Sequence, residues 1–536
     1  EVLDTNTSLE TTISEWVKTY RADSTKGMLE LVNFLIHSCG CNSSVSPSAF
    51  AEEDAVVDIL QELQQELQKD PFHDYPIVSR ARHLKKFRRQ FLDFWTRLID
   101  QCRHDVVYNG VFCETLQEWL TAMSSSTFRP FRHTATATAL CLVGALCDVA
   151  RAVEGELEVA TRQLQAERKK RGEKTRVGER EQGLVDRSQD LHGKKVKLGE
   201  VLTDFFDGVF VHRCRDVEPI IRSECIRDLG TWMIKHPTQF LDASYLRYLG
   251  WLLSDKSPSV RLEAIRSLER LYLKDDFVSS LRQFTERFRG RVIEMAVGEA
   301  DLTIRTVAIK VCETVSRRGF LEETEKEALC PLVFEAEEKV RSAVSGFVKD
   351  VVNEDWVAKK SAEVLLAQKG KKKKDAQVRE DWIELKGLAA FFVKFDGSTG
   401  REKDGEEEMN GKKRKRKDAA KDIVDDAYVE GGGSRKVGRI AEAVEALWWE
   451  MEVLRVTNDL HYLLQDWETL ADYLSRDHST SQAAQSSSVS TPIDPCYRLT
   501  DEEESVLVEV FVACLKLAIE RGNEKEKAKE KKKVSS

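Results

Sequence analysis

Proline and glycine are scarce in this sequence, with 10 and 28 residues respectively in a chain of 536. A β-sandwich or barrel needs turn residues roughly every 8–12 positions, so the scarcity predicts long helices and an all-α fold. No uninterrupted apolar run reaches about 18 residues, and we therefore expect no membrane-spanning helix. The first residue is Glu1 and not Met, so we interpret the sequence as an excised fragment, in which the lack of a signal peptide excludes little.

The motifs of common catalytic sites are also lacking. Neither G-x-x-x-x-G-K-[ST] nor G-x-G-x-x-G is present to hold a phosphate, and G-x-S-x-G and H-E-x-x-H are missing too. The 12 cysteines lie mostly among apolar residues, as in TATALCLVGALCDVA, and are expected to be small buried side chains in a reducing compartment. Cys39 and Cys41 lack the second pair of ligands that a zinc site needs. We therefore predict no enzyme activity, no metal and no cofactor.

Acidic residues outnumber basic ones by 92 to 83, which gives a formal charge of −9. Nucleic-acid binding therefore needs a local basic patch that acts against the charge of the whole chain. Residues 80–92 (RARHLKKFRRQFL) are such a patch, because they contain no acid. We expect a helix over about 80–103, with one apolar face on a core and one basic face. The basic face carries Arg82, Lys85, Lys86 and Arg89, and the apolar face carries Leu84, Phe87, Phe91 and Leu98.

This basic face is either a phosphate-binding surface or an ordinary solvated helix face. A solvated face normally contains acids among its bases, and their absence from 80–92 favours binding to the phosphates of DNA. A second basic block, Lys412–Lys417 (KKRKRK), is either a nuclear localisation signal or a solvating part of a linker.

An internal repeat lies between residues 208 and 350. Four segments end in an aliphatic residue followed by arginine: DVEPIIR (216–222), DKSPSVR (255–261), DLTIR (301–305) and EEKVR (337–341). The arginines are 39, 44 and 36 residues apart (261 − 222, 305 − 261, 341 − 305), and periods near 40 are typical of HEAT-type helical repeats. We expect the acid of each segment to cap a helix start, the aliphatic residue to enter the core, and the arginine to pair with the acid of a neighbouring repeat. The third and fourth copies are degenerate.

The pattern of charge and periodicity divides the chain into six predicted regions. These are an N-terminal helical region (1–153), a long charged helical hairpin projecting from the body (154–207), the repeats (208–367), a disordered charged linker (368–440), further helical repeats (441–521) and a charged tail (522–536). The linker is predicted because its blocks of lysine, glutamate and glycine cannot bury apolar area.

A possible partner site lies in the string SYLRYLGWLLSDK. Its core stripe, Leu246, Leu249 and Leu253, leaves Tyr248 and Trp251 facing away from the core. One repeat further on, FTERFRGRV directs Leu281, Phe284, Phe288 and Val292 inward and Arg287 and Arg291 outward. A projecting Trp251 and a projecting Arg287 would form a notch for an aromatic side chain. The alternative is that Trp251 fills the core, as tryptophan more often does.

Several long strings resemble the stromal-antigen domain of the cohesin STAG/SA subunits, and the sequence looks like an N-terminal to central fragment of a fungal-type member. The strings are FDGVFVHRCRDVEPIIR (206–222), LDASYLRYLGWLLSDKSPSVRLEAIRSLERLY (241–272), FTERFRGRVIEM (284–295), FRPFRHTATATALCLVGALCDVA (128–150), KKFRRQF (85–91), LELVNFLIHSCGC (29–41) and LLQDWETL (463–470). The resemblance is dense from about 14 to 350 and patchier to about 520, and GGGS (431–434) follows no family pattern.

The resemblance implies a hook-shaped HEAT-repeat subunit of the cohesin complex, located in the nucleus and on chromosomes. It implies binding to the kleisin subunit and to double-stranded DNA, and a role in sister-chromatid cohesion and chromosome segregation. The alternative is a HEAT-repeat scaffold that binds only proteins, such as a nuclear-transport or chaperone-like adaptor. Neither reading involves a membrane or a small-molecule substrate.

The resemblance also assigns roles to residues at both candidate sites. The lysines of the family's K-K-F-R string contact DNA, which implies this role for Lys85 and Lys86, and we group Arg82, Arg88 and Arg89 with them. The Trp of Y-[IVL]-G-W and the Arg of F-T-x-R-F receive aromatic peptide motifs of regulatory proteins. These positions correspond to Trp251 and Arg287, and we group Tyr248 with them.

Overall fold

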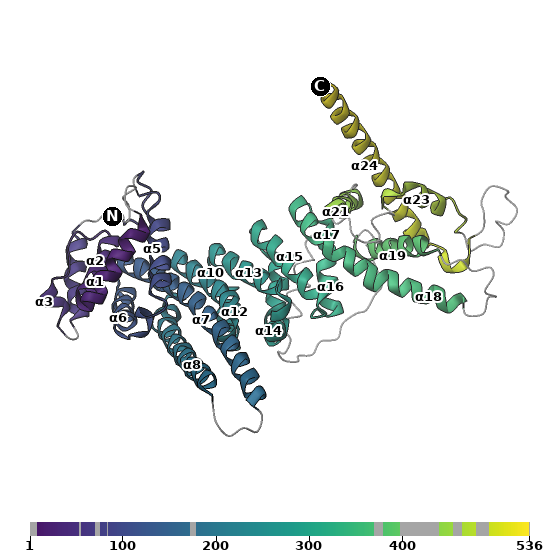
Figure 1. The fold of residues 1–536 in the computed structure, drawn as a ribbon. Helices are drawn as coiled ribbons and strands as arrows, with labels where there is room; N and C mark the ends of the chain where they lie inside the picture. The colour runs from purple at the N-terminus through teal and green to yellow at the C-terminus, as the bar shows by residue number, and fades with distance from the viewer. Residues whose placement is uncertain are drawn as a thin grey trace, which may run out of the picture. The chain divides into compact units, whose positions relative to one another are not determined.

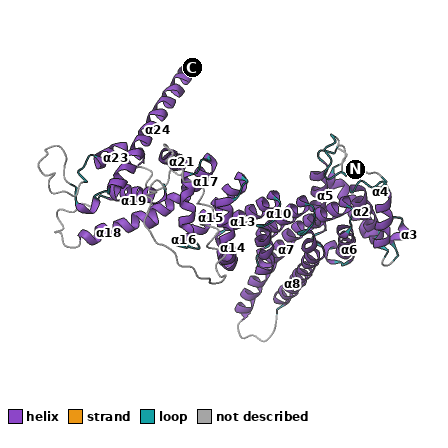
Figure 2. Cartoon of the chain, turned by 180° about the vertical axis from the view of Figure 1, so that it is seen from behind, coloured by secondary structure: helices purple, strands orange, loops and turns teal. Residues whose placement is uncertain are grey.

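The structure is a computed structural model that describes residues 8–52, 55–69, 75–82, 84–171, 178–368, 379–396, 439–453, 464–478 and 493–534. Within these ranges the regular elements are helices and no β-strand occurs, which confirms the predicted all-α fold (Figures 1 and 2). The chain divides into two compact units, Glu1–Arg291 (unit 1) and Val292–Ser536 (unit 2).

Unit 1 begins with short amphipathic helices. They are α1 (Leu9–Ala22), α2 (Ser24–Ser38), α3 (Pro47–Phe50), α4 (Val56–Leu67), α5 (Phe87–Cys102), η1 (Val106–Tyr108) and α6 (Val111–Ser125). Polar side chains fix where the first two begin, since the Thr11 amide donates to Ser8 at 3.2 Å and the Lys26 amide donates to Asp23 at 3.1 Å. The predicted helices in this region are present, but the one expected from residue 80 begins only at Phe87.

Two long helices, α7 (Arg129–Arg171) and α8 (Glu179–Phe205), lie side by side and extend beyond the other helices of unit 1 (Figures 1 and 2). They confirm the predicted charged hairpin, although its first helix begins well before residue 154. The apolar part of α7 has a mean hydropathy of 1.6 over 18 residues and is long enough to cross a membrane, but 72% of that window is buried within the fold. This part of α7 is therefore the central core helix of unit 1.

The repeat helices follow α8 and a π-turn, η2 (Phe206–Phe210). They are α9 (Val211–Arg213), α10 (Pro219–Lys235), α11 (Pro237–Phe240), α12 (Ala243–Leu252), α13 (Pro258–Tyr272), η3 (Asp275–Phe277) and α14 (Val278–Gly298), and the boundary between the units lies inside α14. Unit 2 continues with α15 (Leu302–Arg317), α16 (Glu323–Leu329), η4 (Cys330–Phe334), α17 (Glu338–Val351), η5 (Val352–Val357) and α18 (Ala358–Gln368).

The repeat arginines fold back onto the turn before their own helix. Arg222 donates to the carbonyls of residues 216 and 217 at 2.7 and 3.2 Å, and Arg261 donates to those of 255 and 256 at 2.8 and 3.2 Å. Arg341 does the same in unit 2, at 2.8 Å to both carbonyls. The degenerate third copy differs, because Arg305 donates to the Ala296 carbonyl at 2.9 Å.

Arg222 and Arg305 pair with an acid at the next repeat, as predicted for all four arginines. Arg222 lies 2.7 Å from Asp255 in unit 1, and Arg305 lies 2.7 Å from Glu335 in unit 2. Asp301 caps α15 by accepting the Thr303 and Ile304 amides, whereas Asp255 accepts the Ser257 amide and orders the turn before α13.

One copy of the repeat was not found in the sequence. Arg132 at the start of α7 donates to the carbonyls of residues 126 and 127 at 3.2 and 3.0 Å and pairs with Asp216 at 2.8 Å. The hairpin of α7 and α8 separates this arginine from Arg222 by 90 residues (222 − 132). The regular spacing that reveals the other copies is therefore lost here.

Unit 2 corrects two predicted regions. Its remaining elements are α19 (Glu380–Phe395), α21 (Arg439–Val453), α23 (Trp467–Leu474), η7 (Pro495–Tyr497) and α24 (Asp501–Val534). Residues 380–395 are a helix with a buried face and not linker, because Trp382, Phe391 and Phe392 supply the apolar area that the flanking charged blocks lack. The tail predicted from 522 is helical as far as Val534. Lys412–Lys417 and GGGS (431–434) lie outside the described residues.

Most of the cysteines fill the core, as expected. Ten of the 12 are buried, and Cys141 and Cys496 are half-buried. Burial raises the pKa of the Cys102 and Cys312 thiols to about 12, so that both stay protonated at neutral pH.

Candidate DNA and peptide interfaces

The basic residues of 80–89 (the basic segment) lie mostly in turns and not on a helix. The Leu84 amide donates to the Ala81 carbonyl at 3.0 Å and the Phe87 amide to the Leu84 carbonyl at 2.9 Å, which are turn hydrogen bonds between residues three apart. Lys86 is the N-cap of α5. The predicted helical basic face is therefore wrong for residues 80–82 and 84–86, which lie before the first residue of α5.

The basic segment stands at the end of α5 that favours negative charge. The first turn of α5 contains no acid, and Lys86 makes no side-chain hydrogen bond to cap it. Cations at this end oppose the helix dipole and do not stabilise the helix, whereas an anion there would be favoured. Arg82, Lys85, Lys86 and Arg89 are exposed. The cluster therefore has the charge and the location that suit a phosphate group.

Arg88 has a different environment from its neighbours. Its guanidinium donates to the Glu224 carboxylate of α10 at 2.7 Å, and its side chain is 32% exposed. Arg88 thus ties α5 to α10, which corrects its grouping with the exposed candidate DNA contacts.

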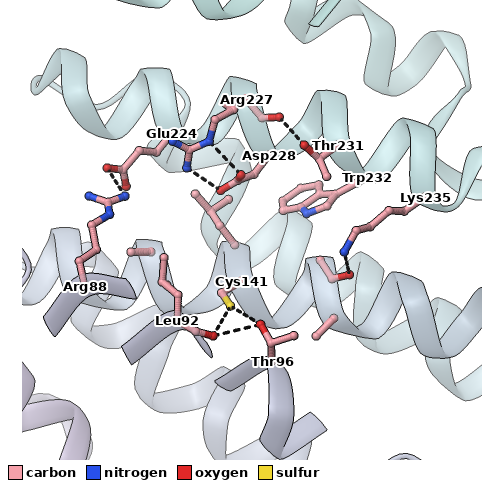
Figure 3. A pocket seen from close by; sticks show the side chains of 14 residues that line it. Arg88, Leu92, Thr96, Cys141, Glu224, Arg227, Asp228, Thr231, Trp232 and Lys235 are labelled. Atoms are coloured by element: carbon pink, nitrogen blue, oxygen red, sulfur yellow. Dashed lines mark hydrogen bonds and ion pairs between the residues drawn. The ribbon is translucent and has the colours of Figure 1, made fainter. Parts of the chain in front are cut away.

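A cavity of about 190 Å³ lies between α5, α7 and α10 (Figure 3). The cations that line it are all paired, since Arg88 contacts Glu224, Arg227 contacts Asp228 at 3.2 Å, and Lys235 contacts Asp148 at 2.6 Å. Burial raises the pKa of Asp228 in spite of the opposing effect of Arg227. These pairs balance the charge of the cavity.

A buried polar chain leads from Arg88 into the core. The Glu224 carboxylate lies 3.2 Å from His133 Nε2, within hydrogen-bond distance. His133 Nδ1 lies 2.8 Å from the Tyr75 hydroxyl. Burial raises the pKa of Tyr75 to about 12. Burial acts to raise the pKa of Glu224 as well, but His133 and Arg88 outweigh it and the net pKa is lowered. No local pattern in the sequence reveals this polar chain, because its members lie 58 and 91 residues apart.

A larger groove of about 740 Å³ lies on the other side of the same segment, between α1, α2 and α5. Its wall contains the aromatic side chains of Trp16, Phe34, Phe87 and Phe94, together with Leu84 of the basic segment. The groove is thus largely apolar and directly adjoins the exposed lysines.

The second candidate site is centred on Trp251 of α12. Its side chain is 43% exposed, which confirms the outward direction predicted for it. The guanidinium carbons of Arg215 and Arg247 lie 5.5 and 5.6 Å from the centre of its ring, within the range of a cation–π interaction. Sequence reasoning missed Arg215, which comes from the turn before α10.

Helix α14 packs directly beside Trp251. A Cβ atom on Gly250 would lie 2.3 Å from the Phe288 ring, so only glycine lets this ring pack onto α12. Arg291 also bridges the two helices, with its guanidinium donating to the Leu253 carbonyl at 3.2 Å. Trp251 and the exposed Arg287 each adjoin this contact in the sequence. The packing therefore brings the two predicted residues to the same region of unit 1.

Tyr248 is not part of the exposed surface, and the prediction that it faces outward is wrong. The side chain is 4% exposed and packs edge-on against Phe206 and Phe210 at 5.5 and 5.4 Å. The π-turn after α8 covers this side of α12, and periodicity within α12 cannot reveal such a second layer. The Tyr248 ring instead packs edge-on against the Trp251 ring, with the ring centres 5.3 Å apart.

Comparison with known proteins identifies two family models in this chain. The STAG domain matches residues 73–183, which include the basic segment, and the stromalin conservative domain matches residues 215–289, which include Trp251 and Arg287. The matched regions thus contain both candidate sites.

Curated relatives show the same likeness over a larger part of the chain. Cohesin subunit psc3 of Schizosaccharomyces pombe is 34% identical over 343 residues, which are 63% of this chain and 35% of that protein. Cohesin subunit SA-3 of Homo sapiens is 35% identical over 341 residues, or 63% of this chain and 28% of that protein. The chain thus spans about a third of the length of these relatives.

A solved structure agrees with the fold. The cohesin subunit Scc3 from Z. rouxii, residues 88–1035, superposes with a TM-score of 0.71 at 20% identity, covering 95% of this chain and 54% of that one. This likeness supports the helical-repeat architecture. Together with the two family models and the curated relatives, it leads to one conclusion: the chain contains a STAG domain and a stromalin conservative domain and is similar to the STAG/SA (stromal antigen) subunits of cohesin.

Proposed function

We propose that this protein is a non-enzymatic regulatory subunit of the cohesin complex. It acts in the nucleus on chromosomes, binds double-stranded DNA and the kleisin subunit, and supports sister-chromatid cohesion. Its similarity to the STAG/SA subunits and the names of its relatives as cohesin subunits support this proposal.

The observation that carries the DNA part is the acid-free group of exposed cations at the start of α5. Arg82, Lys85, Lys86 and Arg89 are exposed there in a chain whose formal charge is −9. Such contacts neutralise phosphates and read no base edges, so we expect binding to duplexes of unrelated sequence.

The test is the double substitution Lys85→Glu with Lys86→Glu. Each lost phosphate contact lowers the slope of log affinity against log salt by about 0.9, so the slope should fall by about two units and binding should weaken equally on unrelated duplexes. The matched control is Lys169→Glu with Lys170→Glu on the exposed end of α7, which changes the net charge equally. Equal affinity of the wild type and the Lys85/Lys86 variant at low salt would contradict DNA binding by this segment.

The partner proposal has its own experiment. When the protein is used as bait in nuclear extract, we expect the cohesin core, including the kleisin subunit, to be retained. Retention of other nuclear proteins without cohesin subunits, and without salt-dependent DNA binding, would favour the alternative protein-only HEAT scaffold.

We propose a second binding site at Trp251 and Arg287 for short peptides that carry aromatic side chains. The supporting observation is an exposed tryptophan ring with the guanidinium groups of Arg215 and Arg247 over it. An aromatic side chain can stack between such groups, and arginine and tryptophan are the residues most often found as binding anchors.

Substitutions in α12 and α14 test this second site. Trp251→Ala should lower the affinity for a peptide with two aromatic residues about thirtyfold, which corresponds to an anchor of about 2 kcal/mol, with little change in thermal unfolding. Arg287→Glu should act similarly, and the two losses should not add. Tyr248→Ala is the matched control, because loss of this buried ring should cost about 3–5 kcal/mol of stability. A clear drop in the unfolding temperature of Trp251→Ala would contradict the binding role.

A further inference from the structure

On both sides of the exposed lysines, at Tyr75 and at Arg88, the chain is attached to the same buried pair of side chains. Tyr75, just before the segment, is hydrogen-bonded to His133 Nδ1 at 2.8 Å. Arg88, near its end, donates to Glu224 at 2.7 Å. His133 Nε2 and Glu224 are themselves 3.2 Å apart. A loop that begins and ends on one polar pair thus carries the exposed lysines.

The two residues of the pair lie on the buried faces of α7 and α10. His133 belongs to the buried part of α7 and its side chain is 0% exposed, and Glu224 of α10 is 5% exposed. A buried polar chain of this kind holds its members in one geometry, because any displacement leaves a buried polar group without a partner. Ile77 and Phe87 also bury apolar side chains beside the two attachment points, but apolar contacts are not directional.

Between Tyr75 and the start of α5, the described residues (75–82 and 84–86) form turns and no helix. The Ser79 amide donates to the Tyr75 carbonyl at 3.1 Å and the Leu84 amide to the Ala81 carbonyl at 3.0 Å. Lys85 precedes α5 and Lys86 is its N-cap, so their position relative to α7 and α10 depends on how the turns before α5 and the start of α5 are held.

We propose that His133 and Glu224 are positioning residues of the DNA interface, which hold the loop from Tyr75 to Arg88 so that Lys85 and Lys86 face the DNA backbone together. This inference rests on the proposed binding of DNA by the basic segment. A loop released from the pair would have to be ordered on binding. Ordering a single residue costs a factor on the order of ten in affinity.

The sign of the expected effect separates positioning from simple electrostatics. Glu224 is an acid close to a group of cations, so its charge alone disfavours phosphate, and Glu224→Gln should then strengthen DNA binding slightly. Positioning predicts the opposite. Glu224→Gln should weaken binding on the order of tenfold, while the salt slope stays the same because every exposed cation still meets a phosphate in the complex.

The experiment compares Glu224→Gln and Tyr75→Phe with the wild type in the full chain. Each variant keeps the shape of the side chain. Tyr75→Phe removes the hydrogen bond to His133, and Glu224→Gln removes the negative charge that attracts Arg88. Asp228→Asn is the matched control, because it removes an acid from the same helix whose partner is Arg227 and not the loop. The measurements are the affinity for a duplex over a range of salt concentrations and the rate of tryptic cleavage after Arg80, Arg82, Lys85 and Lys86 without DNA.

We expect weaker binding, an unchanged salt slope and faster cleavage in both variants, and none of these changes in Asp228→Asn. Unchanged or tighter binding by folded Glu224→Gln, or cleavage as slow as in the wild type, would overturn the inference. If Glu224→Gln does not fold, the same outcomes are decided on Tyr75→Phe. Failure of the Lys85/Lys86 substitution to reduce binding would instead overturn the proposed DNA site itself, so the two failures are distinguishable.

Discussion

Two helix starts in unit 1 carry basic side chains in opposite ways. At the start of α10, Arg222 folds back onto two carbonyls and pairs with Asp255, and its side chain is only 13% exposed. At the start of α5, Lys85, Lys86 and Arg89 are exposed, and no acid occurs in the first turn. Arg222 links one repeat to the next. The cations at α5 face solvent at the N-terminal end of a helix, where the free backbone amides attract anions.

The comparison shows that burial and an acid partner, and not residue type, separate structural cations from those that are exposed and free to meet a ligand. Arg88 marks the boundary between the two kinds. It belongs to the basic segment in sequence, but its side chain is half-buried and ion-paired with Glu224. A basic run in a sequence is therefore an upper limit on the cations that are available to DNA.

The largest effect is expected from breaking a structural pair. Arg222→Leu removes the partner of Asp255, whose side chain is 9% exposed, and should destabilise unit 1 by about 3 kcal/mol. Chemical unfolding measures the loss, and the salt slope of DNA binding should not change. Arg222→Lys is the control. It should lose less stability than Arg222→Leu because it keeps the charge, but it should still lose some because lysine cannot form the two-point hydrogen bond. A changed salt slope in folded Arg222→Leu would contradict the division into two kinds.

A smaller loss is expected from the corresponding arginine of the degenerate third repeat. Arg305 pairs with Glu335, but the Glu335 side chain is 37% exposed, so water replaces much of the lost interaction. Arg305→Leu should therefore destabilise unit 2 by about 1–2 kcal/mol, as measured by chemical unfolding. A loss of stability as large as that of Arg222→Leu would show that the exposure of the acid does not determine how much stability the broken pair costs.

The structural pairs should also make stability depend on acidic pH. Burial acts to raise the pKa of Asp255, but the hydrogen bond with Arg222 and the Ser257 amide outweigh it, and the folded pKa is lowered. The unfolded value of an aspartate is about 4. The stabilisation is therefore fully present above about pH 4 and is lost as the pH falls through the lower folded value. Thermal unfolding between neutral pH and acid should show this loss, and Asp255→Asn should make the dependence shallower.

The sequence predicted those features that depend on local periodicity. The spacing of the repeat arginines revealed the fold and their pairing, and the apolar stripe of α12 placed Trp251 outside the core. The errors arose where distant segments decide the outcome. Tyr248 is covered by the π-turn after α8, and Arg88 is drawn inward by Glu224, more than 130 residues away in the chain.

The predicted linker shows the same limit at a different scale. The composition of 368–440 as a whole favours disorder, but α19 within it has its own apolar face with Trp382, Phe391 and Phe392. Composition averaged over a long segment hides a single helix. A window of about one helix length would have separated the helix from the charged blocks on either side.

The smallest expected effect comes from Arg89, which adjoins Arg88 and differs from it mainly in exposure. Arg89→Ala removes an exposed side chain on the first turn of α5, so stability should change by no more than about 0.5 kcal/mol. If its guanidinium contacts a phosphate, the salt slope should fall by about 0.9, equally for unrelated duplexes. Arg89→Lys should restore the slope, because one charge per phosphate is all that this term needs. An Arg89→Ala variant with reduced stability and an unchanged slope would place Arg89 with the structural arginines and limit the DNA contacts to the turns before the helix.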